Sequence, residues 1–313
     1  MRFIKLFAAL FLITSVTACT HNEEIKPNLS YTAPARFYEG LPSAFTPLTA
    51  EEKRTDWGKE LLIASSLGRE QDLFRAVTGF KRARIFLAEE TPNPQRQAQI
   101  EYGLLLSYWL GNKYESVIEL FENGKLQVSA ETFPAYDALL VMLYDSYLKA
   151  NQLAKAEKTL TLMKKKSDAL AAKINLYTEL STANIAQLEA NRTPEIQNLM
   201  SSFTSNKKSP FKAELYNALL PGAGYFYVGQ TQSAITSFFI NALFIAATYE
   251  FLHHGQTAAG IITGGFELGW YIGGIRGAGL AASQYNNTLY NNLARDTMVK
   301  QKLFPILMLD YAF

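Results

Sequence analysis

Cysteine is nearly absent from this chain, since Cys19 is the only one among 313 residues. A disulfide bond within one chain is therefore excluded, and we expect packing alone to provide stability, even in an oxidising compartment. Histidine is also scarce: besides His21 there are only the neighbours His253 and His254, which would point in different directions on a helix. These three residues give a histidine-based metal site too few ligands, so we expect no metal.

An excess of charge of one sign is missing as well. The chain has 30 Lys and Arg against 28 Asp and Glu, and cleavage before Cys19 would remove Arg2 and Lys5, which leaves equal numbers. Nucleic-acid binding needs a basic face that releases counterions from phosphates. We therefore expect no nucleic acid as a partner.

The common catalytic signatures do not occur. The chain has no Gly-x-Ser-x-Gly elbow, no Walker loop and no His-Glu-x-x-His. Residues 277–282 formally fit the dinucleotide fingerprint, but that motif requires a preceding strand, and this copy lies inside a glycine-rich apolar stretch. We predict that the chain is not an enzyme and has neither catalytic residues nor a cofactor.

Residues 1–18 have the pattern of an export signal. Arg2 and Lys5 precede an apolar run, Leu6 to Ile13, which is too short to span a bilayer. The following order, Val16-Thr17-Ala18-Cys19, resembles the lipobox of bacterial lipoproteins. The resemblance implies that Cys19 is lipidated with fatty acids such as palmitate and becomes the first residue of the mature chain. The alternative is an ordinary cleaved signal in which the cysteine is incidental.

Residues 19–52 predict a flexible tether, because four prolines stand among Ser, Thr and Asn without helical periodicity. Phe37-Tyr38 and Phe45 leave open that this segment docks onto the next domain instead.

Residues 53–205 predict a domain of helices broken at polar turns, in which three stretches share one spacing. Ala76, Phe80 and Ala83 are four and three residues apart, and the same offsets recur at Val117, Phe121 and Gly124 and at Ala156, Leu160 and Met163. Tyr108 and Tyr147 stand nine residues before Val117 and Ala156. The pattern resembles the tetratricopeptide repeat, although its units start 41 and 39 residues apart and not 34. The resemblance implies an α-solenoid whose concave face binds a partner; a generic array of helical hairpins is the alternative. Helical stretches at 168–189 and 193–203 are expected to cap it.

Residues 211–292 predict a membrane domain because charge almost vanishes there. Ser233 to Leu252 is long enough to cross a bilayer core of about 30 Å, and a second apolar segment runs from Thr257 to Ser283. A short polar break between them predicts a helical hairpin. The predicted fold class is thus all-α: a TPR-like solenoid followed by a glycine-rich, membrane-associated helical hairpin.

Glycine recurs every fourth residue in the second apolar segment, at Gly265, Gly269, Gly273 and Gly277. Four residues advance a helix by about 400°, so these glycines form one bare stripe. Such a stripe lets a neighbouring backbone approach closely in lipid. We expect the first helix of the hairpin, or the same stripe on another copy, to lie there.

The hairpin is preceded by a turn with the residues Pro221, Gly222, Gly224, Tyr227 and Gly229. Their order resembles a class of small bacterial two-helix membrane domains that open with a Pro-Gly-x-Gly-x-x-Tyr-x-Gly turn. The resemblance covers about residues 214–292 and implies a fold, but no activity.

Polar side chains within the apolar region are Asn241, Glu250, Glu267 and Arg276. Such groups are costly in lipid, which makes them candidates for a functional role. We expect a structural role: Glu267 accepts a hydrogen bond from Tyr271 or Asn241, and Arg276 extends toward the interface. Ion or proton transport is the alternative. The tail, residues 293–313, is expected to pack on the hairpin or on a partner.

Together these features predict a lipid-anchored protein of the bacterial cell envelope that is a protein–protein interaction scaffold or accessory factor in envelope assembly. Its partners would be an envelope protein bound by the repeat domain, membrane lipid, and further copies of itself. The alternative is an oligomeric small channel or transporter component with a regulatory repeat domain; an enzyme of peptidoglycan metabolism is a weaker option. Thr20 after the cysteine favours the outer membrane, whereas two spanning helices favour the inner one. The outer membrane is favoured by a little, with the repeat domain facing the periplasm.

Overall fold

The computed structural model describes residues 25–90, 93–123 and 133–313, which divide into two compact units. We call residues 30–180 with 296–313 the array unit, and residues 25–29 with 181–295 the hairpin unit. Regular structure in the described residues is helical, as the all-α prediction states, apart from one isolated bridge between Ser43 and Ala312. The predicted signal peptide and Cys19 lie outside the described residues.

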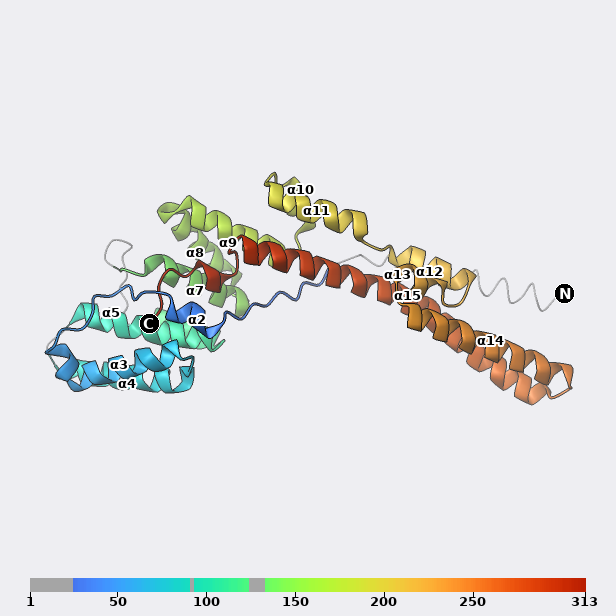
Figure 1. The fold of residues 1–313 in the computed structure, drawn as a ribbon, viewed down its shortest axis with the longest axis horizontal. Helices are drawn as coiled ribbons and strands as arrows, with labels where there is room; N and C mark the ends of the chain where they lie inside the picture. The colour runs from blue at the N-terminus through green and yellow to red at the C-terminus, as the bar shows by residue number, and fades with distance from the viewer. Residues whose placement is uncertain (1–24, 91–92, 124–132) are drawn as a thin grey trace. The chain divides into compact units, whose positions relative to one another are not determined.

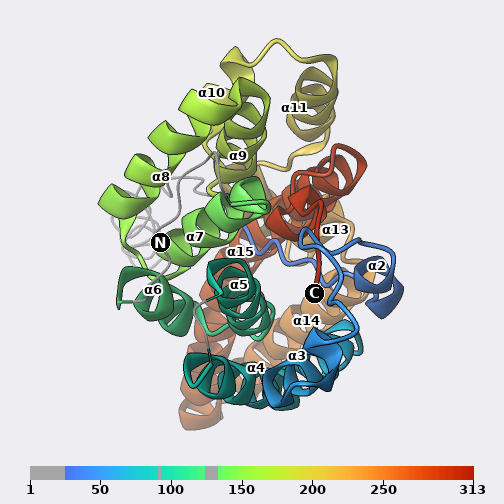
Figure 2. The ribbon, with the colours of Figure 1, turned by 90° about the vertical axis from the view of Figure 1, so that its left-hand side faces the viewer.

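The array unit contains three helical hairpins that follow one another along the chain (Figure 1). Each helix packs on the next, and Figure 2 shows them stacked in chain order. A further helix, α9, packs on α7, where the hydroxyl groups of Tyr144 and Thr178 lie 2.9 Å apart. The elements of this unit are α2 (Ala35–Glu39), η1 (Glu52–Arg54), α3 (Asp56–Arg69), α4 (Leu73–Ala88), α5 (Pro94–Leu110), α6 (Tyr114–Asn123), α7 (Tyr136–Lys149), α8 (Leu153–Lys166), α9 (Asp168–Ser181) and η2 (Pro305–Met308).

The same turn closes all three hairpins. Gln71, Asn112 and Asn151 have left-handed backbone angles, with φ of 63°, 55° and 56°. The next amide in each turn donates to a carbonyl five residues back, at 2.9, 2.9 and 2.8 Å. This is the Schellman end of a helix, which satisfies carbonyls that the last helical turn leaves free. The turns are 41 and 39 residues apart, the same steps as those between the units in the sequence.

The residues chosen from the sequence as repeat core lie at the helix contacts. Ala76, Phe80, Ala83, Val117, Tyr147 and Ala156 are buried. Tyr108, Phe121 and Leu160 are half-buried, because their helix faces are covered only in part. Small residues at 76, 83 and 156 allow the paired helices to approach closely.

The hairpin unit begins earlier in the chain than the expected boundary near residue 205. Helices α10 and α11 belong to it and not to the array, because Phe203 of α11 packs edge-on against Tyr290 of α15 at 5.7 Å between ring centres. The expected second cap of the array, 193–203, is therefore part of another core. The helices of this unit are α10 (Ile185–Ala190), α11 (Pro194–Asn206), α12 (Pro210–Leu219), α13 (Ala223–Val228), α14 (Thr231–His253) and α15 (Thr257–Lys300).

Candidate functional site

The turn before the hairpin depends on its glycines. Gly222 and Gly229 have φ of 93° and 91°, which side chains rarely tolerate. A Cβ at Gly222 would collide with the carbonyl oxygen of Ala234, and one at Gly224 with that of Ala213. The backbone of α13 can therefore lie directly against α12 and α14.

The other two residues of this turn are also placed by the fold. Pro221 follows the end of α12 at Leu219. The hydroxyl oxygen of Tyr227 accepts a hydrogen bond from the backbone amide of Ser209 at 3.2 Å, and the Lys208 ammonium lies 5.1 Å from the centre of the Tyr227 ring. The turn thus joins α12, α13 and the start of α14 into one compact base of the hairpin.

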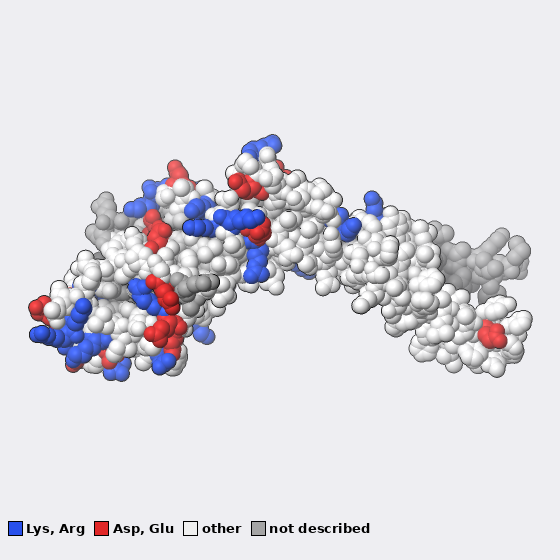
Figure 3. All heavy atoms as spheres, viewed as in Figure 1, with Lys and Arg blue, Asp and Glu red and all other residues white. Residues whose placement is uncertain are grey.

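Helices α14 and α15 form an antiparallel hairpin with an apolar outer surface (Figure 1). No Lys or Arg occurs between Lys212 and Arg276, and Figure 3 shows this end of the hairpin unit almost without charge. Helix α14 is the one described helix that is long and apolar enough to cross a membrane. The exposed large apolar residues of the pair include Phe239, Leu243, Tyr249, Ile261, Phe266 and Trp270.

Helix α14 does not lie on the glycine stripe, which corrects the first of the two expectations for it. A Cβ at Gly265, Gly269 or Gly273 would meet nothing within 4 Å. The contact with α14 is made by the neighbouring row of α15, where a Cβ at Gly264 would lie 3.3 Å from Thr248. Only the last glycine of the stripe is covered, because a Cβ at Gly277 would collide with the Tyr225 hydroxyl.

The bare part of the stripe forms the floor of a groove of about 740 Å³. Its lining includes Gly265, Gly269, Gly273 and three aromatic side chains, Tyr225, Phe266 and Trp270, together with polar side chains from the first turns of α14. The volume is in the range of small-molecule sites, but the floor offers no charged group. An apolar chain is the kind of ligand that it can hold.

The polar residues of the hairpin have other partners than expected. Tyr271 donates to the carbonyl oxygen of Ala218 at 2.6 Å and not to Glu267. The Asn241 side chain, 1% exposed, donates to the carbonyl oxygen of Ser237 at 2.6 Å. Asn241 Oδ1 and Glu267 Oε2 accept no hydrogen bond from any described residue. Both helices therefore keep a polar atom inside the hairpin.

The two remaining charges lie at the ends of the hairpin. Arg276 Nη1 lies 3.9 Å from Glu214 Oε1 of α12, at the base. Glu250 Oε1 lies 3.2 Å from His254 Nδ1, near the turn between α14 and α15. Charged groups therefore lie at both ends of the apolar surface of the hairpin.

In the array unit, the predicted tether is not free over residues 30–52, because its apolar side chains are buried against the array. Ala33, Tyr38, Phe45 and Leu48 are buried, and Phe45 contacts Tyr102 of α5 with ring centres 5.9 Å apart. The docking left open for Phe37-Tyr38 and Phe45 is therefore what the structure shows, with Phe37 half-buried.

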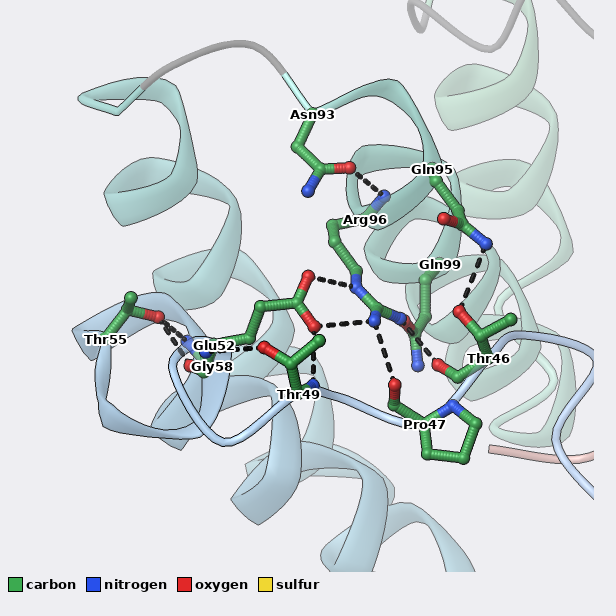
Figure 4. A network of polar contacts seen from close by, with 10 residues as sticks. All are labelled: Thr46, Pro47, Thr49, Glu52, Thr55, Gly58, Asn93, Gln95, Arg96 and Gln99. Carbon is green, nitrogen blue, oxygen red and sulfur yellow. Dashed lines mark hydrogen bonds and ion pairs between the residues drawn. The ribbon is translucent and has the colours of Figure 1, made fainter.

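Arg96 of α5 holds this segment in place, as Figure 4 shows. Arg96 is 3% exposed, and its guanidinium donates to both carboxylate oxygens of Glu52, at 2.8 and 2.7 Å. It also donates to the carbonyl oxygens of Thr46 (2.6 Å) and Pro47 (3.1 Å). The bonds with Arg96 lower the pKa of Glu52. Nothing in the sequence around Arg96 indicated this role, since the partners lie more than forty residues away.

The end of the predicted tail, residues 303–313, belongs to the array unit and packs within it. Phe313 is 6% exposed and stacks on Phe80 at 5.9 Å between ring centres, while Arg69 donates to its carbonyl oxygen. Tyr102 donates to the carbonyl oxygen of Tyr311 at 3.2 Å, and Ala312 N to that of Pro42 at 2.9 Å. The face formed by α3, α5 and α7 is thus covered by two segments of the same chain.

Buried carboxyl groups of the array have structural surroundings. Asp145 accepts hydrogen bonds from Trp109 Nε1 (2.9 Å) and from the Tyr177 hydroxyl (3.1 Å). Glu101 is 4% exposed and lies 3.5 Å from Arg84. Burial raises the pKa of both carboxyl groups. In the described part of the chain, no three His, Cys, Asp or Glu side chains are grouped so that they could hold a metal ion.

Comparisons with models of protein families, with curated proteins and with solved structures gave no match.

Proposed function

We propose that this chain is a membrane-anchored lipoprotein of the bacterial envelope whose helical array is a scaffold for a protein partner. The observation that carries the proposal is the hairpin of α14 and α15, with exposed apolar side chains and no Lys or Arg from residue 213 to 275. An exposed apolar surface of this extent in water would favour aggregation, whereas in lipid it is the stable arrangement.

The length of the hairpin supports a spanning arrangement. Helix α14 has 23 residues and is about 35 Å long at 1.5 Å per residue. A bilayer core of about 30 Å fits between the base, with Lys212 and Arg276, and the opposite turn, with Glu250 and His254. Tyr225 and Tyr227 at the base suit a membrane interface.

The lipid on Cys19 is the second attachment in this proposal. One acyl chain alone binds membranes marginally, so a lipidated cysteine together with the hairpin gives permanent anchoring. The array then faces the periplasm, and the outer membrane is favoured over the inner because Thr20 follows the cysteine.

The partner of a TPR-like array would normally lie on the face of its first helices, but here residues 30–48 and 303–313 cover that face. The proposed partner surface is therefore formed by the second helices of the hairpins. Phe74 at the start of α4 is 85% exposed, and Leu153 at the start of α8 is 62% exposed. Each position lies in the first turn of the second helix of its hairpin: Phe74 comes three residues after the left-handed Gln71, and Leu153 comes two residues after Asn151.

A photoreactive residue at Phe74 or Leu153, in cells that make the full chain, tests the proposal, with Gln197 of α11 as the exposed control position. Crosslinking to one dominant envelope protein from the array positions, and not from the control, is the expected result. Membrane fractions from the same cells show which membrane holds the chain. Crosslinks only between copies of this chain would refute the scaffold.

An oligomeric channel is the second candidate, and the unpaired Glu267 Oε2 inside the hairpin favours it. Against it, Arg276 lies beside Glu214 at the base and not beside Glu267. Replacing Glu267 by Gln and Arg276 by Leu without loss of function would rule it out.

A further inference from the structure

The first described residues lie along helix α15. The backbone amide of Lys26 donates to Asn287 Oδ1, and that of Asn28 donates to Asn291 Oδ1, both at 3.0 Å. Asn287 and Asn291 are four residues apart and share one face of the helix. From Asn28 to Lys26 the chain therefore advances toward the glycine-rich part of α15.

The covalent reach of the chain beyond Lys26 is long enough for Cys19 to reach the groove. Cys19 precedes Lys26 by seven residues, which span at most about 25 Å when extended. Gly273, at the near end of the groove floor, precedes Asn287 by fourteen residues, which is about 21 Å along the helix. A group attached to Cys19 can thus lie at the entrance of the groove.

The length of the groove and its apolar lining suit an acyl chain. From Gly273 to Gly265 its floor is about 12 Å long, and an acyl chain in one leaflet extends over about 15 Å, half of the bilayer core. The glycines leave the floor flat, and Phe266 and Trp270 line it with apolar surface. The groove starts near Arg276, at the base of the hairpin, so it lies in the leaflet nearest the base.

We propose that an acyl chain of the lipid on Cys19 lies in this groove, so that the lipid anchor and the hairpin form one membrane-embedded structure. The inference rests on the proposed lipidation of Cys19. Other occupants are free phospholipid and the glycine stripe of a second copy. The linked acyl chain is preferred because a short linker holds it at an effective concentration of about millimolar at the groove.

Photocrosslinking of the full-length lipidated chain in cell membranes tests this proposal. A benzophenone amino acid replaces Trp270, which lines the groove; the control replaces Leu243, which is 68% exposed on α14 and does not line it. Mass spectrometry then identifies the crosslinked group. The expected product joins residue 270 to the acylated Cys19 peptide and is absent for residue 243.

A second variant fills the groove with a larger side chain so that an acyl chain no longer fits. Gly269→Leu should lower the yield of the Cys19 product about tenfold or more, whereas Ala246→Leu, on the exposed side of α14, should not change it. Crosslinks from residue 270 only to free phospholipid or to a second copy would overturn the proposal. The mass of the Cys19 peptide is read separately: an unacylated peptide would refute the lipoprotein function itself, and the groove proposal with it.

Discussion

Replacing Arg96 by Ala should destabilise the array unit by about 3 kcal/mol, because the change leaves the Glu52 carboxylate and the carbonyl groups of Thr46 and Pro47 without their donor. Breaking a buried ion pair costs about 3 to 5 kcal/mol. Glu52 retains 19% exposure of its side chain and regains some water, which places the cost at the lower end of that range. The equilibrium constant for unfolding would rise roughly a hundredfold.

Urea unfolding of the full chain in detergent micelles measures this change. Two of the three tryptophans, Trp57 and Trp109, lie in α3 and α5 and report on the array. Arg96→Lys should lose less stability than Arg96→Ala, since it keeps the charge but cannot make the two-pronged contact.

The matched control is Arg82→Ala, because Arg82 pairs with Glu60 at 2.7 Å on the surface, with 58% of its side chain exposed. Exposed pairs contribute less than about 1 kcal/mol. Hydrogen exchange should increase over residues 46–52 in the Arg96 variant only. Equal losses for Arg96→Ala and Arg82→Ala would refute the role assigned to Arg96.

Two other predictions use the same unfolding experiment. Phe313→Ala should lower the free energy of unfolding by about 3 to 5 kcal/mol, because it removes the buried ring that stacks on Phe80. A loss under about 1 kcal/mol would show that the tail does not stabilise the array. For Glu101, burial raises the folded-state pKa, so the folded state binds more protons than the unfolded state between the unfolded pKa, about 4.3, and that raised value. Wild-type stability should therefore fall as pH rises through this window, and Glu101→Gln should remove that part of the pH dependence; identical slopes for both proteins would contradict the assignment.

The parts of the fold that depend on local pattern were predictable from the sequence. The spacing around Ala76, Val117 and Ala156 reflects helix pairs that pack through small residues, and the same interval appears in the left-handed turns at Asn112 and Asn151. The apolar segments of the hairpin and the glycines of its first turn are equally local features.

The partners in contacts between distant segments were not predictable. The buried tail at Phe313 and the clamp at Arg96 join residues 233 and 44 positions apart, and no periodicity encodes such pairs. The glycine stripe shows a subtler limit. Gly264 and Gly274 belong to a second row of small residues, and spacing alone does not say which row α14 covers.

The depth of α14 in a membrane tests the central claim most directly. A spin label on Ala242→Cys, at the middle of α14, and one on Gln197→Cys, on exposed α11, can be compared in reconstituted bilayers, since acylation would leave Cys19 unable to react. The account predicts that the label at 242 lies near the bilayer centre, about 15 Å below the interface, and is shielded from a water-soluble relaxation agent. Equal access of that agent to both labels would contradict the membrane hairpin.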